Sequence, residues 1–135
     1  MMVAYSGNIQ KVYVNTLWCY YLYQFAHYLF EDIDEIKFAN LLNLRCEKNS
    51  IKIRTKEGYR FCYFLSVLES ELRFNSTTKE LWLSQILEAT NINRSSYDSH
   101  YLDPVNKFKD YKSNKKLVKE FKKALEDIDR VQKKS

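Results

Sequence analysis

The stretch "LWCYYLYQFAHYLF", residues 17–30, is a nearly unbroken apolar run with aromatic and aliphatic side chains at helical spacing. It predicts a helix that begins at Asn15 or Thr16, because either side chain can cap a helix N-terminus. Apolar residues cover much of its circumference, so we expect this helix at the centre of the fold. The run is too short to span a bilayer and lacks the cleavage site of a signal peptide. We therefore expect a core helix of a cytoplasmic protein that has no membrane partner.

The composition of the chain favours one mostly α-helical domain. Apolar residues make up 45% of the 135 residues, which is enough for a core without metal or disulfide support. With only two glycines and one proline, the chain lacks the turn residues of all-β folds. The sequence predicts a single-domain bundle of five to six helices over residues 1–135. One short β-hairpin is allowed near residues 50–57, where isoleucines alternate with basic residues.

The spacing of apolar residues also sets the bounds of the later helices. They are predicted over residues 34–44, 59–74, 79–92 and 114–132. Thr77 and Glu80 have the spacing of a capping box in front of the third of these. A further short helix is expected after Ser95 or Ser96, and it must end before Pro104.

No stretch of the sequence matches a catalytic or metal-binding motif. Cys19, Cys46 and Cys62 are widely spaced and form no C-x-x-C pair, so we interpret them as buried apolar residues in a reducing compartment. The scarcity of glycine excludes phosphate-binding loops. His27 and His100 lie in different segments. Ser96, Asp98, Ser99 and Asp103 near His100 could form a nucleophile and base arrangement, but the sequence shows no oxyanion site for a triad. We therefore expect a protein that is not an enzyme and that holds no cofactor and no metal.

Positive charge is concentrated at the end of the chain. Residues 105–135 contain eleven Lys or Arg and five Asp or Glu, whereas the whole protein has a net charge of only +5. This asymmetry suggests an anionic partner for the last quarter of the chain. DNA or RNA is the first expectation, and an acidic protein surface is the second.

The predicted C-terminal helix, residues 114–132, is amphipathic. One face carries an apolar stripe that must dock on this domain or on another chain. The stripe consists of Leu117, Val118, Phe121, Ala124, Leu125, Ile128 and Val131. Lysines lie opposite, which is also what an ordinary solvated helix presents. Lysines gather near the start of the helix and acidic residues toward its end, which runs against the helix dipole and favours anion binding at the start.

Two sets of basic residues are candidates for contact with nucleic acid, because lysines neutralise phosphates and aromatic rings stack on exposed bases. The first set consists of Lys107, Lys109, Tyr111, Lys112, Lys115, Lys116, Lys119, Lys122 and Lys123. The second set consists of Arg45, Lys48, Lys52, Arg54, Lys56 and Arg60. If both sets share a face of the protein, the case for binding is stronger.

The segment "FLSVLESELRFNSTTKELWLSQILEATNINRSSYDSHYLDPVNKFKDYKSNKKLVKEFKKALEDI", residues 64–128, resembles the C-terminal domain of RteC-type regulators of conjugative elements in its helix order and in a few aromatic and basic positions. The resemblance implies a helix-turn-helix-like DNA-binding module in which residues 95–102 face a groove. The chain departs from the family after the tyrosines, where "LDPVNKFKDYK" replaces a basic run. That departure weakens the expectation of base-specific reading.

These observations predict a non-enzymatic protein of phage or mobile-element type that binds nucleic acid or a nucleoprotein through its basic C-terminal region. The alternative is a protein-binding inhibitor or adaptor, such as an anti-defence protein resembling anti-CRISPR inhibitors that block a nuclease complex. In that case the lysines would meet an acidic surface or intercept contacts to RNA. The oligomeric state stays open.

Overall fold

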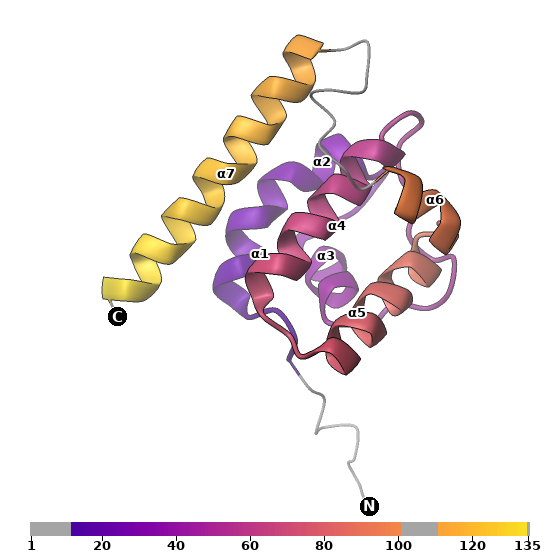
Figure 1. The fold of residues 1–135 in the computed structure, drawn as a ribbon, viewed down its shortest axis with the longest axis horizontal. Coiled ribbons are helices and arrows are strands. Elements are labelled where there is room, and N and C mark those ends of the chain that lie inside the picture. Colours follow the sequence, from indigo (N-terminus) through magenta and orange to yellow (C-terminus); the bar gives the residue numbers. More distant parts are fainter. Residues whose placement is uncertain (1–11, 101–110, 135) are drawn as a thin grey trace, which may run out of the picture.

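A computed structural model describes residues 12–100 and 111–134 (Figure 1). The apolar run at residues 17–30 is helical, but it is divided into α1 (Thr16–Leu22), a 3-10 turn η1 (Tyr23–Phe25) and α2 (Ala26–Leu29). Asn15 caps α1, and its side-chain oxygen accepts a hydrogen bond from the backbone N–H of Trp18 at 3.0 Å. The prediction of one uninterrupted helix was wrong at the 3-10 turn, although its start and its central place were right.

Five more helices follow, namely α3 (Glu35–Leu42), α4 (Gly58–Leu72), α5 (Ser76–Ala89), α6 (Arg94–His100) and α7 (Tyr111–Lys134). If the divided first run counts as one helix, the described residues form six helices. The predicted mostly α-helical bundle of five to six helices is therefore confirmed. No helix in the described ranges is long and apolar enough to cross a membrane.

The β-hairpin allowed near residues 50–57 does not form. In residues 12–100 and 111–134 the only β-type pairing is an isolated antiparallel bridge between Phe30 and Ile53. The backbone N–H of Arg54 donates to the carbonyl of Leu29 at 2.8 Å beside this bridge. The alternating segment is thus extended, as predicted, but it pairs with the end of α2 instead of folding back on itself.

The start of α5 also differs from the prediction. Asn75 caps the helix, and its side-chain oxygen accepts from the backbone N–H of Thr78 at 2.8 Å. The helix already includes Thr77, so the capping box of Thr77 and Glu80 does not exist. Asn75 is suited to this place because Arg73, in the left-handed conformation with φ of 55°, ends α4 two residues earlier.

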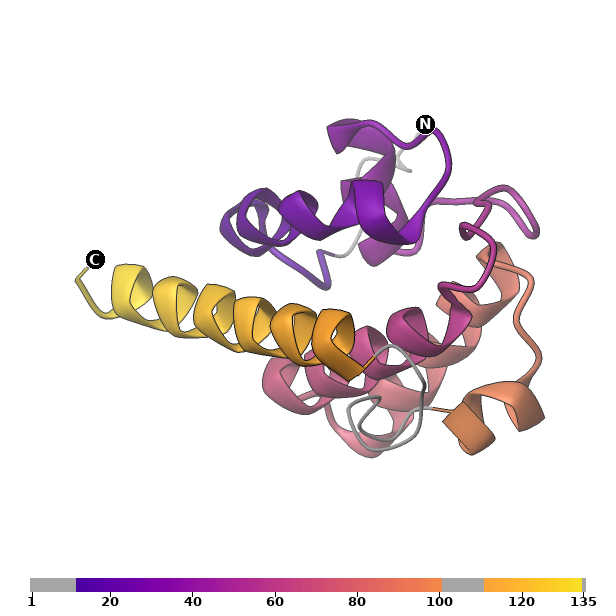
Figure 2. The ribbon, with the colours of Figure 1, turned by 90° about the horizontal axis from the view of Figure 1, so that it is seen from above.

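A single core cluster contains buried residues from α1, η1, α2, α3, α4, α5, α6 and α7. Trp82 is fully buried, and its indole N–H donates to the carbonyl of Leu42 at 2.8 Å, which satisfies the one polar atom of that side chain. Figure 2 shows α7, in yellow, lying between the α1–α2 run and α4.

The apolar stripe of α7 docks within its own chain. Val118, Phe121, Ala124 and Ile128 are buried, whereas Val131 at the end of the stripe is 36% exposed. The helix spans residues 111–134, slightly longer at both ends than the predicted 114–132. Docking of this stripe turns the opposite, lysine-bearing face of α7 toward solvent.

Candidate nucleic-acid interface

The outer face of α7 is a ridge of basic side chains. The helix contains nine Lys or Arg and four Asp or Glu. The exposed cations with described side chains, named here the α7 ridge, are Lys115, Lys116, Lys119, Lys122, Lys123, Arg130 and Lys133. At a rise of 1.5 Å per residue, a helix of 24 residues is about 36 Å long. The α7 ridge runs from residue 115 to residue 133, which is about 27 Å of this length.

Some cations of the α7 ridge make ion pairs along the helix. They join Lys116 to Glu120, Lys123 and Arg130 to Asp127, and Lys133 to Asp129. Hydrogen bonds from Lys123 and then Arg130 hold the pKa of the Asp127 carboxyl below its ordinary value. The cations of these pairs are 62–79% exposed, and pairs with such exposed cations contribute little and are screened by salt. They leave the lysines able to exchange their partner for a phosphate.

The observed ends of α7 alter where its charged residues lie relative to the helix dipole. The helix begins at Tyr111, which puts Lys115 beyond the first turn, where the dipole effect has largely faded. Its last turns carry Arg130 and Lys133, which the dipole favours. Six of the nine cations of α7 lie between residues 112 and 123, and the other three follow the acidic residues Glu126, Asp127 and Asp129.

Four predicted residues of the first set cannot be placed. Lys107 and Lys109 lie outside the described residues, and so do the side chains of Tyr111 and Lys112. The basic and aromatic connector in front of α7 therefore stays a prediction.

The members of the second basic set differ in how far contacts within the chain hold them. The Arg60 guanidinium donates to both carboxylate oxygens of Glu57 at 2.9 and 2.8 Å, and both side chains are only 17% exposed. The Arg54 Nε donates to the carbonyl of His27 at 2.7 Å, and Lys52 lies 3.8 Å from a carboxylate oxygen of Glu31. The remaining members, Arg45, Lys48 and Lys56, are exposed.

The two basic sets meet at one point. Arg60 from α4 and Lys116 from α7 line the same pocket, which has a volume of about 130 Å³. Tyr28, Leu117 and Glu120 complete the lining, so that α2, α4 and α7 each contribute. Tyr28 was not a predicted site residue, because nothing in the sequence indicates that α2 lies beside the start of α7.

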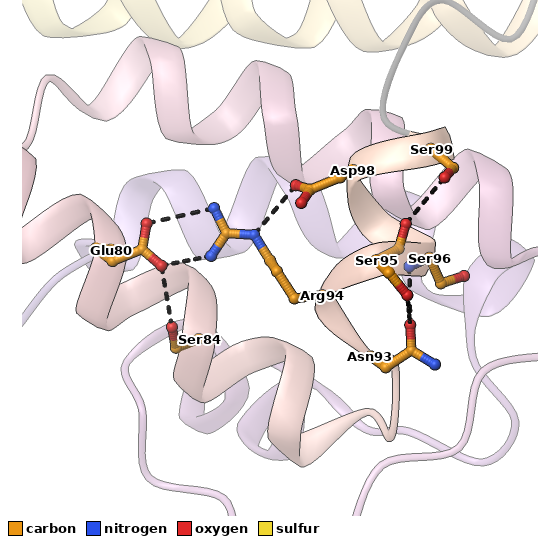
Figure 3. A network of polar contacts seen from close by, with 8 residues as sticks. All are labelled: Glu80, Ser84, Asn93, Arg94, Ser95, Ser96, Asp98 and Ser99. Carbon is orange, nitrogen blue, oxygen red and sulfur yellow. Dashed lines mark hydrogen bonds and ion pairs between the residues drawn. The ribbon is translucent and has the colours of Figure 1, made fainter.

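A second feature that the sequence did not indicate is the polar network that fixes α6 (Figure 3). Arg94 pairs with Glu80 of α5 and, through its Nε at 3.2 Å, with Asp98. The hydrogen bonds from Arg94 lower the pKa of the Glu80 carboxyl. Asn93 caps the helix by accepting from the backbone N–H of Ser96 at 2.8 Å. The single arginine of α6, the helix that the family resemblance directs toward a groove, is thus already held by two carboxylates.

A groove of about 700 Å³ runs between α1, α4 and α7. Trp18, Tyr63, Val67 and Leu125 give it apolar walls. Its charged lining residues are Glu71, Arg73, Lys122, Glu126 and Asp129. With three carboxylates and two cations, the lining of this groove has a net negative charge, unlike the α7 ridge next to it.

Possible metal ligands do not cluster in the part of the chain that the structure describes. No group of three or more His, Cys, Asp or Glu side chains there could hold a metal ion. Cys19 and Cys62 are buried and Cys46 is half-buried, all three as free thiols. Burial raises the pKa of the Cys62 thiol to about 11, which keeps it protonated and a poor nucleophile.

Comparisons of the chain with protein-family models, with curated proteins and with solved structures find no match. The resemblance of residues 64–128 to RteC-type regulators therefore stays a prediction. What this protein binds has to be argued from the geometry and charge of its own residues.

Proposed function

We propose that this protein is a non-enzymatic nucleic-acid-binding or nucleoprotein-binding protein of phage or mobile-element type, and that the α7 ridge contacts the phosphate backbone. The observation that carries the proposal is the two-sided nature of α7. Its apolar face is fixed in the core by Phe121 and Ile128, while its cations are exposed along its length. The helix that carries the cations is already ordered, so binding to phosphates does not require its backbone to lose conformational freedom.

The ridge suits binding without base recognition. Lysines act as point charges on phosphates, whereas base reading uses the planar groups of Arg, Asn or Gln. Arg130 and Gln132 are the only such side chains described in α7, and both lie near its C-terminal end. We therefore propose affinity that depends strongly on salt and weakly on sequence.

Fluorescence anisotropy with labelled DNA and RNA over a series of salt concentrations tests the proposal. The logarithm of the binding constant should fall with the logarithm of the salt concentration. Replacing Lys119, Lys122 and Lys123 together by Gln should make this slope shallower by roughly two to three, because about 0.9 counterion is released per phosphate contact. The matched control replaces three exposed cations of the second set, Arg45, Lys48 and Lys56, by Gln. Absence of any binding by the unaltered protein at low salt, or equal losses in both triple variants, would count against the proposal.

Protein binding is the second candidate function, and the groove between α1, α4 and α7 favours it. Trp18 and Leu125 offer apolar contact area, and Glu71, Glu126 and Asp129 offer negative charge to a basic segment of a partner. Such a partner would fit an inhibitor or adaptor of a nuclease complex. Co-purification from a bacterial lysate with and without nuclease distinguishes protein binding from nucleic-acid binding. A partner protein bound directly in the groove stays bound after nuclease treatment, whereas one bridged by nucleic acid is lost.

A further inference from the structure

The pocket at which the two basic sets meet has the parts of a base-binding site. Tyr28 of α2, Arg60 of α4 and the residues Lys116, Leu117 and Glu120 of α7 surround a volume of about 130 Å³. Beneath it lies an apolar layer that shares Arg60 and Leu117 with the pocket. The other residues of that layer are Phe25, Leu29, Tyr63, Phe64 and Phe121. The lining of the site thus combines an aromatic ring, an apolar side chain, two cations and a carboxylate, and apolar side chains adjoin it.

The exposed ring of Tyr28 has an aromatic neighbour on its own helix. The Tyr28 side chain is 47% exposed, and its ring lies 4.3 Å from the ring of His27, with the two planes inclined by 33°. The carbonyl of His27 accepts from Arg54 Nε at 2.7 Å, which ties the backbone of α2 to the segment after Ile53. An exposed tyrosine on such a fixed support can stack on a flat ligand at small cost in side-chain entropy.

The cations at the edge differ in how they are held. Arg60 is fixed by its two hydrogen bonds to Glu57, at 2.9 and 2.8 Å. Lys116 is 79% exposed and lies 3.9 Å from a carboxylate oxygen of Glu120, which is too long for a hydrogen bond. The Lys116 ammonium can therefore turn toward a phosphate without giving up a strong contact. A phosphate held there would lie beside the ring of Tyr28.

We propose that this pocket binds one unpaired base, stacked on Tyr28 with its phosphate on Lys116, so that the preferred ligand of the α7 ridge is single-stranded nucleic acid. The inference rests on the proposed function, because the ridge supplies the remaining phosphate contacts. In a duplex both faces of each base are covered by neighbouring bases, so Tyr28 adds nothing to duplex binding. In a single strand the base faces are accessible, and stacking on aromatic side chains is tolerant of sequence.

The test measures anisotropy with three labelled probes of equal length, roughly 15 nucleotides, within the range of single-strand sites. They are an oligothymidylate, an abasic strand with the same phosphates, and a duplex. Tyr28→Ala should weaken oligothymidylate binding roughly five- to hundredfold, the range that loss of one stacked base gives, and should leave abasic and duplex binding unchanged. Tyr28→Phe should restore the affinity, because the ring and not the hydroxyl does the stacking.

Tyr20→Ala is the matched control, since Tyr20 is 66% exposed on α1 and does not line the pocket. Thermal unfolding of each variant verifies that it folds. The base-binding proposal would be wrong if the unaltered protein bound oligothymidylate and the abasic strand with equal affinity, or if Tyr28→Ala and Tyr20→Ala had equal effects. Either outcome would leave phosphate contact by the α7 ridge as proposed. If no probe binds at low salt, the proposed function and this inference both fall.

Discussion

The ring of Phe121 in α7 lies stacked on the ring of Phe64 in α4, with ring centres 4.9 Å apart and planes inclined by 25°. The edge of Phe25 contacts the same ring of Phe121, with ring centres 5.5 Å apart. These contacts tie α7 to both sides of the cleft between the α1–α2 run and α4. They set the rotation of α7 about its axis, and that rotation decides which side chains face solvent. The aromatic contact in the core therefore determines the geometry of the α7 ridge.

Replacement of Phe121 by Ala should destabilise the protein by about 3–5 kcal/mol, because it removes a buried ring and leaves a cavity against Phe64 and Phe25. Urea unfolding followed by tryptophan fluorescence measures the change. Val131→Ala, on the same stripe but 36% exposed, should change stability by less than about 1 kcal/mol. Similar midpoints for the two variants would contradict the docking of α7 by Phe121.

Much of this fold could be predicted from the sequence, because apolar periodicity reports which face of a helix is buried. In α7 the predicted stripe includes the observed buried residues Val118, Phe121, Ala124 and Ile128. The failures depend on contacts between distant segments. The bridge between Phe30 and Ile53 turned an expected hairpin into a single extended segment.

The candidate site could be predicted only in part. Exposure of the lysines follows from the helical wheel of α7, since its apolar side has to be buried. The pairing of Arg60 with Glu57, the residue just before α4, could have been found from their spacing of three. The position of Tyr28 beside Lys116 could not, because it depends on how α2 packs against the start of α7.

The side chain of Asn43 should be needed to fix the segment in front of α1. Its oxygen accepts from the backbone N–H groups of Tyr13 and Val14 at 2.7 and 2.9 Å, and its amide donates to the carbonyls of Val14 and Ala39, both at 3.0 Å. Asn43→Ala leaves buried backbone groups without partners, so we expect a loss of about 2–4 kcal/mol in urea unfolding. Asn40→Ala, at a half-buried position of α3, is the control and should cost much less. Equal costs would show that the four bonds contribute little.

The ion pair between Glu80 and Arg94 should make the attachment of α6 depend on pH. The pKa of Glu80 is lowered in the folded protein, so its contribution is present above the ordinary carboxyl pKa and is lost as pH falls through the lowered value. Because the two side chains are 60% and 45% exposed, the contribution should be no more than about 1 kcal/mol. Glu80→Gln should reduce stability at pH 7 and have no effect at a pH well below the ordinary carboxyl range. A constant difference at all pH values would exclude the ion pair as its cause.

Glu69 in α4 should show the opposite dependence on pH. Its Oε2 atom is buried and has no hydrogen-bond partner, and burial raises the pKa of the carboxyl, an effect that Lys79 and Arg94 only partly offset. The folded protein therefore holds the Glu69 proton more tightly than the unfolded chain does. Ionisation of Glu69 therefore lowers the free energy of unfolding. This destabilisation is absent at a pH below the ordinary carboxyl pKa, grows as the pH rises, and reaches its full size above the raised pKa.

Glu69→Gln removes the buried charge with little change in shape, so it should stabilise the protein at pH 7 by up to about 1 kcal/mol. The gain should vanish near pH 3, where Glu69 is protonated in both the folded and the unfolded chain. Glu71→Gln on the exposed side of the same helix is the matched control and should show no such gain. Thermal unfolding at both pH values measures the difference. A loss of stability at pH 7 in the Glu69 variant would mean that the carboxylate has a favourable partner, and the burial argument would then be wrong.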